Sequence, residues 1–145
     1  MRECAIVVGF ALVVGAGYAP TPEPLQGASS KQTVEVGDPP TIWDGVYTTE
    51  QAARGERTAW ANCFTCHSES EWSSPLLLNI GSGQRLGDLY NVIRQSMPLD
   101  APGRLSSDQY VDVIAYMLKL LDAPTGEAEL PPDLAELDRI RVTAP

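Results

Sequence analysis

The sequence predicts a small all-α protein. Three separate segments place apolar residues at helical spacing, and two of them follow a Ser or Thr that matches a helix-capping box. Neither an alternating strand pattern nor an internal repeat stands out among the 145 residues. The three segments fall within residues 43–122, a length at which a core made only of side chains is thin.

The first helix is predicted over residues 49–62. Thr48 is the expected N-cap, and Gln51 is the residue that would complete the capping box. Residues 68–84, which come after this helix and a short Cys-containing stretch, hold Ser, Pro, Gly and a Leu run without clear periodicity. We therefore expect this segment to be mostly loop.

Two further helices are predicted towards the C-terminus. Apolar residues at helical spacing indicate a helix over residues 86–95 that ends before Pro98. A second capping box, Ser106 with Gln109, precedes a strongly amphipathic segment, which predicts a third helix over residues 107–121.

The composition divides the chain into four parts. Residues 1–19 resemble a signal peptide, and residues 20–42 form a Pro-rich linker. The helical domain is expected over residues 43–122. Residues 123–145 are expected to be an acidic C-terminal tail containing a short helical piece at residues 133–137.

The N-terminal segment predicts export. An apolar run over residues 4–19 is shorter than the roughly 20 residues that span a bilayer, and Gly17 and Ala19 are the small residues expected before a cleavage site. The mature protein is then expected in the periplasm. An uncleaved N-terminal anchor is the alternative, because Glu3 offsets the positive charge of Arg2.

The formal net charge of −9 argues against nucleic acid as a partner. It favours a periplasmic protein that docks through apolar contacts or onto a basic patch. A solvated acidic surface without functional meaning is the alternative interpretation.

The sequence Cys63-Phe64-Thr65-Cys66-His67 carries the chemistry. Cys-x-x-Cys-His is the spacing at which one c-type haem is attached covalently, with the two thiols as tethers and the imidazole as an iron ligand. A zinc site is a poorer interpretation, since it normally needs four ligands and only three are present. A thioredoxin-like pair would require a βαβ pattern, which the surrounding sequence does not show.

Met97 is the candidate for the second iron ligand. It precedes Pro98 at a helix end, whereas Met117 lies on the apolar face of the third helix, where a core role is expected, and Met1 lies in the signal segment. His/Met ligation fills both axial positions, and the chain has no other histidine to act as an acid or base. Electron transfer is therefore expected rather than catalysis.

The residues 43–122 resemble class I c-type cytochromes. The shared features are Gly55 in the first helix, the Cys-x-x-Cys-His motif, Pro75-Leu76, Met97-Pro98 and Tyr116 in the last main helix. The resemblance implies three main helices wrapped around one haem, with the first and last crossing near Gly55 and Tyr116. It also implies that the carbonyl of Pro75 accepts a hydrogen bond from the ring of His67.

A closer resemblance is to cytochrome modules that accompany quinoprotein dehydrogenases. It rests on residues 43–48, 51–55 and 110–116. It implies a pyrroloquinoline quinone enzyme as electron donor and an oxidase or another cytochrome as acceptor. Two alternatives remain, a haem-based gas or redox sensor with a displaceable Met97, and a membrane-tethered subunit of a larger respiratory complex.

Overall fold

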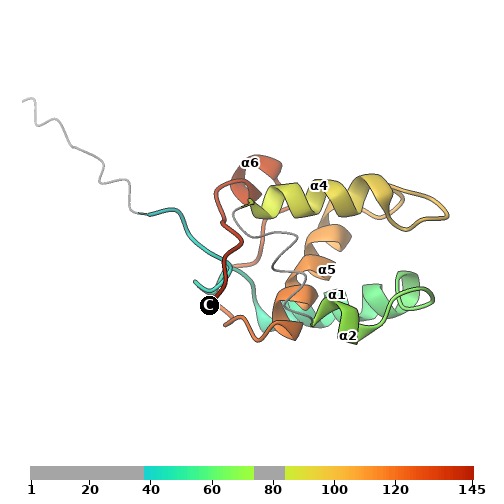
Figure 1. Cartoon of the computed structure of the whole chain (residues 1–145), viewed down its shortest axis with the longest axis horizontal. Coiled ribbons are helices and arrows are strands. Elements are labelled where there is room, and N and C mark those ends of the chain that lie inside the picture. The colour runs from blue at the N-terminus through green and yellow to red at the C-terminus, as the bar shows by residue number, and fades with distance from the viewer. Residues whose placement is uncertain (1–37, 74–83) are drawn as a thin grey trace, which may run out of the picture. The chain divides into compact units, whose positions relative to one another are not determined.

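The computed structural model describes residues 38–73 and 84–145, all within one unit that spans Glu35–Pro145. The helices are α1 (Thr49–Asn62), α2 (Glu69–Trp72), α4 (Leu86–Ser96), α5 (Ser107–Leu120) and α6 (Leu134–Leu137) (Figure 1). In the two described ranges no strand forms, and extended segments pair only through isolated bridges of Arg141 with Thr41 and Arg85. The all-α prediction is therefore confirmed for these residues.

The three main predicted helices are observed almost at their predicted bounds. The short helix α2 was not predicted, because its sequence Glu-Ser-Glu-Trp has no periodicity of its own. The predicted signal peptide, most of the linker and Pro75 lie outside the described residues. None of the described helices is long and apolar enough to cross a membrane.

The two predicted capping boxes have different outcomes. Ser106 and Gln109 form the reciprocal pair, with each backbone N–H donating to the other's side chain. Thr48 caps α1 as predicted, accepting from the Gln51 N–H at 3.1 Å. The Gln51 side chain, however, does not complete that box. It is buried and bonds both backbone groups of Leu130, at 2.8 and 3.0 Å.

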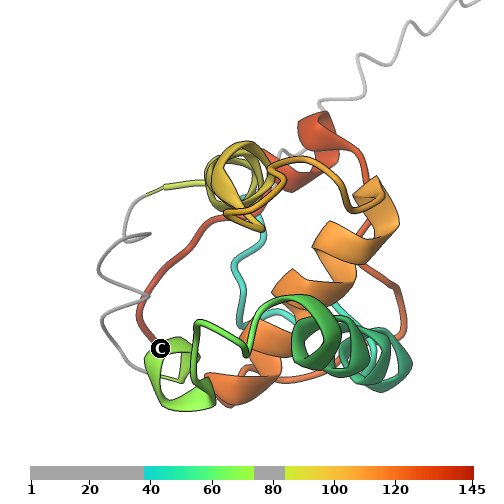
Figure 2. The same ribbon diagram turned by 90° about the vertical axis from the view of Figure 1, so that its right-hand side faces the viewer.

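Helices α1 and α5 cross at Gly55, and this crossing is the main helix contact of the structure (Figure 2). A Cβ atom placed on Gly55 would lie 1.8 Å from the carbonyl oxygen of Asp112 and 3.0 Å from the Cβ of Tyr116. Only glycine permits this approach. The crossing near Gly55 and Tyr116, which the family resemblance implies, is confirmed.

Helix α5 lies between two apolar clusters. Eight of its consecutive residues, Val111–Leu118, are buried together with Tyr110, so that α5 has no solvent-facing stripe over most of its length. The first cluster joins residues of α1, α4, α5 and α6 to the chain before α1 and after α5. Its buried members are Ile42, Tyr47, Ala52, Leu86, Tyr90, Tyr110, Val111, Ile114, Ala115, Leu118, Ala123, Leu130, Leu137, Ile140 and Val142. The second joins α1, α2 and α5 through Ala59, Trp72, Val113, Tyr116 and Met117.

The core extends past the boundary predicted at residue 122. Leu130, Leu137, Ile140 and Val142 are all buried in the first cluster, so the segment that the composition set apart as a tail contributes apolar residues to the core. α6 lies beside α4 (Figure 1). This added apolar area enlarges a core that would otherwise be thin for its length.

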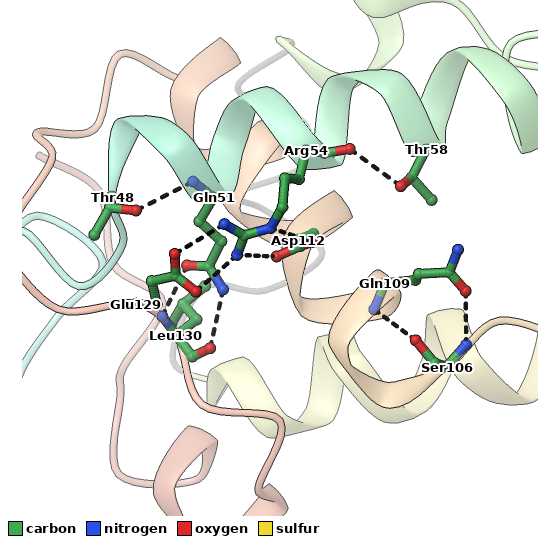
Figure 3. Close-up of polar contacts among 9 residues, drawn as sticks. All are labelled: Thr48, Gln51, Arg54, Thr58, Ser106, Gln109, Asp112, Glu129 and Leu130. Atoms are coloured by element: carbon green, nitrogen blue, oxygen red, sulfur yellow. Dashed lines mark hydrogen bonds and ion pairs between the residues drawn. The ribbon is translucent and has the colours of Figure 1, made fainter.

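Arg54 fastens the C-terminal segment to the α1/α5 crossing (Figure 3). Its guanidinium makes paired hydrogen bonds to Asp112 on α5, both at 3.0 Å, and to Glu129, at 2.9 and 2.7 Å. Such two-pronged pairs are the strongest geometry for arginine and carboxylate. The hydrogen bond from Arg54 lowers the pKa of Glu129 below its ordinary value of 4.5.

We expect Gly55→Ala to destabilise the protein by about 2 kcal/mol or more, because the added methyl group collides with backbone that cannot move aside. Urea denaturation followed by circular dichroism measures the loss. Ala61→Ser, at an exposed position of the same helix, is the control and should change stability by less than about 1 kcal/mol. Equal stabilities of the two variants would contradict the observed crossing.

Glu129→Gln should remove part of the pH dependence of stability. Because its pKa is lowered in the folded protein, Glu129 stabilises the fold above pH 4.5, and this contribution is lost as the pH falls through the folded-state pKa. The stability difference between wild type and variant should therefore be present at pH 6 and vanish in more acidic solution, as urea titrations at each pH can show. Glu127→Gln, at an exposed neighbouring position, is the control. A difference that grows on acidification would show that the sign is wrong.

Candidate functional site

The Cys-x-x-Cys-His motif forms a tight turn that continues directly from α1. The N–H of Cys63 donates to the Ala59 carbonyl at 2.8 Å, which places Cys63 at the C-cap of the helix. The N–H groups of Cys66 and His67 both donate to the Cys63 carbonyl at 3.0 Å. The two thiols and the imidazole are thereby held within one turn of backbone.

Neither thiol of the motif is in a disulfide in the part of the chain that the structure describes. Cys63 is half-buried against the second cluster, and burial raises the pKa of its thiol, an effect that nearby Arg104 partly offsets. Cys66 is exposed. No three Cys, His, Asp or Glu side chains converge as a metal-binding group within residues 38–73 and 84–145.

The imidazole of His67 is oriented by Glu71. Its Nδ1 lies 3.1 Å from the Oε2 of Glu71, four residues further along the chain. This hydrogen bond lowers the pKa of the Glu71 carboxyl. A carboxylate beside Nδ1 favours the tautomer with the proton on Nδ1, and in the neutral imidazole that tautomer leaves a lone pair on Nε2 that can bind a metal.

Four aromatic rings surround the turn. Phe64, from inside the motif, packs on Trp72 with ring centroids 5.0 Å apart and on Trp60 at 5.1 Å. Trp72 lies 6.1 Å from the ring of His67 and 6.4 Å from that of Tyr116. These distances fall within the range of favourable edge and offset packing. The aromatic contacts fix the turn and α2 against α5.

A hydrogen bond from Tyr116 also fastens α2 to α5. The Tyr116 hydroxyl donates to the carboxylate of Glu69. Burial, and then this hydrogen bond, raise the pKa of Tyr116. Since Glu69 and Trp72 both attach α2 to the same tyrosine, the position of Glu71 between them is set by the core.

Met97 is held by its backbone at the end of α4. It is the C-cap of that helix, with its N–H donating to the Ile93 carbonyl at 2.8 Å, and it is partly buried. Its own carbonyl accepts from the buried Tyr110 hydroxyl at 2.8 Å. A helix end on one side and a core tyrosine on the other thus fix where Met97 lies.

Arg104 connects the segment after Met97 to the end of α1. Its guanidinium donates to Asp100 at 3.1 Å and to the Oδ1 of Asn62 at 3.0 Å. Asn62 is the last residue of α1 and immediately precedes Cys63. The structure therefore ties the loop that contains Met97 to the turn that contains the thiols, although no described contact joins the side chains of Met97 and His67.

Partly buried apolar side chains accompany these residues. Ile93 of α4 packs against both apolar clusters, and Cys63, Phe64 and Leu120 pack against the second. Met117 is buried in that second cluster, which confirms its predicted core role. Pro75, expected to accept from His67, lies outside the described residues.

Four residues that support this site were not predicted from the sequence: Glu71, Trp72, Arg104 and Tyr110. Only Glu71 had a local signal, because a residue four positions after His67 lies on the same side of a helical turn. The contacts of Arg104 with Asn62, of Tyr110 with Met97 and of Trp72 with Tyr116 join residues 42, 13 and 44 positions apart, and no local pattern predicts them.

Comparisons of the chain with protein-family models, with curated proteins and with solved structures find no match. The assignment of a function therefore rests on the residues and geometry of the site.

Tyr110→Phe should loosen the backbone around Met97. Removing the hydroxyl leaves the Met97 carbonyl without this donor, so we expect a loss of about 1 kcal/mol and faster hydrogen exchange at the amides of Met97 and Ala101. Tyr47→Phe is the matched control, because it removes a similar bond to the Ala123 carbonyl elsewhere in the core. Tyr47→Phe should lower the free energy of opening at these two amides by no more than it lowers the global free energy of unfolding. Equal exchange patterns in both variants would refute a specific role for Tyr110.

Proposed function

We propose that the protein is an exported, mono-haem c-type cytochrome that carries electrons. In this proposal Cys63 and Cys66 attach the haem, His67 binds the iron on one side and Met97 binds it on the other. The fold would be that of a class I cytochrome c, whose three main helices here are α1, α4 and α5.

The motif turn is the observation that carries the proposal. It presents two free thiols and one imidazole from five consecutive residues, with Nδ1 of His67 occupied by Glu71. An imidazole held through Nδ1 offers Nε2 to a metal, which is the arrangement that metal-binding histidines commonly adopt. The thiols, by contrast, do not converge with other ligands in the described part of the chain, so they fit covalent tethers better than a zinc site.

The neighbouring residues also fit a large apolar group. Ile93, Phe64 and Leu120 are only partly buried although they pack on the core clusters, so they have apolar surface available for a further contact. A bound haem supplies a one-electron Fe(III)/Fe(II) couple. The chain's part is to hold both axial ligands at fixed places and to keep water away from them.

The anchoring of Met97 favours an electron carrier over a gas sensor. A sensor needs a ligand that leaves easily, whereas the backbone of Met97 is held on both sides, by its N–H donating to the Ile93 carbonyl and its carbonyl accepting from the Tyr110 hydroxyl, each at 2.8 Å. The chain's single histidine is His67, so no second histidine is present to assist proton transfer. Both observations support transfer of electrons without bond-making chemistry.

The proposed partners are redox proteins of the periplasm. The closer family resemblance suggests a pyrroloquinoline quinone dehydrogenase as donor and an oxidase or cytochrome as acceptor. The formal charge of −9 supports a partner that presents a basic surface.

The experiment is expression in a host that attaches c-type haem, followed by spectroscopy of Met97→Ala. The wild type should contain one covalent haem, and its oxidised form should show the weak near-infrared band of an iron–methionine bond. Met97→Ala should lose that band while keeping the haem. Met117→Leu, a conservative change in the core, is the control and should keep both.

Three results would count against the proposal. Absence of covalent haem in the wild type would show that Cys63 and Cys66 are not haem attachment sites and would refute the proposed function. Survival of the band in Met97→Ala would exclude Met97 as the ligand. Rapid binding of carbon monoxide by the reduced wild type would favour the sensor instead, because a firmly bound Met97 blocks that position.

A further inference from the structure

We propose that Glu71 is a positioning residue for the iron ligand His67, and that its carboxylate lowers the reduction potential of the site. This inference rests on the proposed haem function and deepens it. The family resemblance implies a neutral backbone carbonyl, that of Pro75, as the acceptor of the His67 ring. Among the residues that the structure describes, the side chain facing Nδ1 of His67 is charged, the carboxylate of Glu71.

The geometry places Glu71 at the ring nitrogen that does not bind the metal. Oε2 of Glu71 lies 3.1 Å from Nδ1 of His67. The two residues flank Ser68, the N-cap of α2, so the first turn of this helix brings the carboxylate back towards the imidazole. The His67 side chain is 34% exposed and faces the ring of Trp72, whereas the Glu71 side chain is 56% exposed, so the shielding from water is on the His67 side of the pair.

The Glu71 side chain is itself exposed, but the backbone of α2 that carries it is attached to the core on both sides. Trp72, the next residue, is buried among Phe64 and Tyr116. Glu69, two residues earlier, accepts a hydrogen bond from Tyr116. Because both neighbours are fixed to α5, α2 cannot turn freely, and the Glu71 carboxylate is held towards His67.

A carboxylate acceptor changes the ligand more than a carbonyl does. Hydrogen bonding to a carboxylate raises the basicity of a metal-bound imidazole and fixes its tautomer and ring orientation. A more basic imidazole stabilises Fe(III) relative to Fe(II). The reduction potential of the wild type should therefore lie below that of a variant with a neutral acceptor.

Glu69 provides a matched control on the same short helix. It carries the same charge, but its carboxylate contacts Tyr116 and makes no described contact with His67. A long-range effect of negative charge would appear in both Glu69→Gln and Glu71→Gln. An effect of the hydrogen bond would appear only in the second.

The test is redox titration of the holoprotein and of Glu71→Gln, Glu69→Gln and Glu71→Asp. At a fixed ambient potential, Glu71→Gln should raise the ratio of reduced to oxidised protein about tenfold, which is about 59 mV for a one-electron couple. Glu69→Gln should change the ratio by less than about threefold. Glu71→Asp retains a carboxylate and should fall between the wild type and Glu71→Gln.

Nuclear magnetic resonance of the His67 ring gives a second readout that does not depend on electron transfer. In ¹⁵N-labelled wild type, the Nδ1–H proton should be observable and exchange slowly, and Glu71→Gln should shift it and speed its exchange. Equal potential shifts in Glu69→Gln and Glu71→Gln, or an unchanged Nδ1–H signal in Glu71→Gln, would overturn the inference. Those results leave the haem and its Met97 band intact, whereas a wild type without covalent haem would refute the proposed function itself.

Discussion

The close approach of α1 and α5 at Gly55 is the constraint on which the rest of the structure depends. The backbone of α1 meets the Asp112 carbonyl and the Cβ of Tyr116 at a distance that leaves no room for a side chain. This contact fixes α1 against α5, and the motif follows directly from the end of α1. Because Tyr116 also contacts Phe64 and Trp72 and bonds Glu69, one residue of the crossing reaches both sides of the motif turn.

The crossing also explains why the C-terminal segment belongs to the core. Asp112, whose carbonyl faces Gly55, is itself buried, and its carboxylate needs a partner there. Arg54 supplies that partner from the neighbouring position on α1, and its remaining donors bind Glu129. The buried carboxylate of Asp112 is thus linked through Arg54 to Glu129, which lies far along the chain. The adjacent Leu130 is held by hydrogen bonds to Gln51.

Local interactions explain which parts of this structure the sequence could predict. The three main helices and two caps follow from periodicity and from side chains that bond within three residues, so they were predictable. The motif itself is local too. Gln51 was predicted to cap α1 because it stands three residues after Thr48, but its buried partner Leu130 is 79 residues away in sequence. Arg104 and Tyr110 support the site in the same way, through contacts that no spacing in the sequence encodes.

The two ends of α1 make different contacts, and both sets help to orient the site. Near its start, Gln51 and Arg54 bind the C-terminal segment and α5, which fixes the rotation of the helix about its axis. Near its end, Asn62 accepts from Arg104, and Cys63 continues into the turn. In an α-helix a slip of one residue turns every side chain by about 100°. The polar contacts of Gln51 and Arg54, which precede the thiol of Cys63 by twelve and nine residues, therefore help to set the direction in which Cys63 faces without contacting the motif.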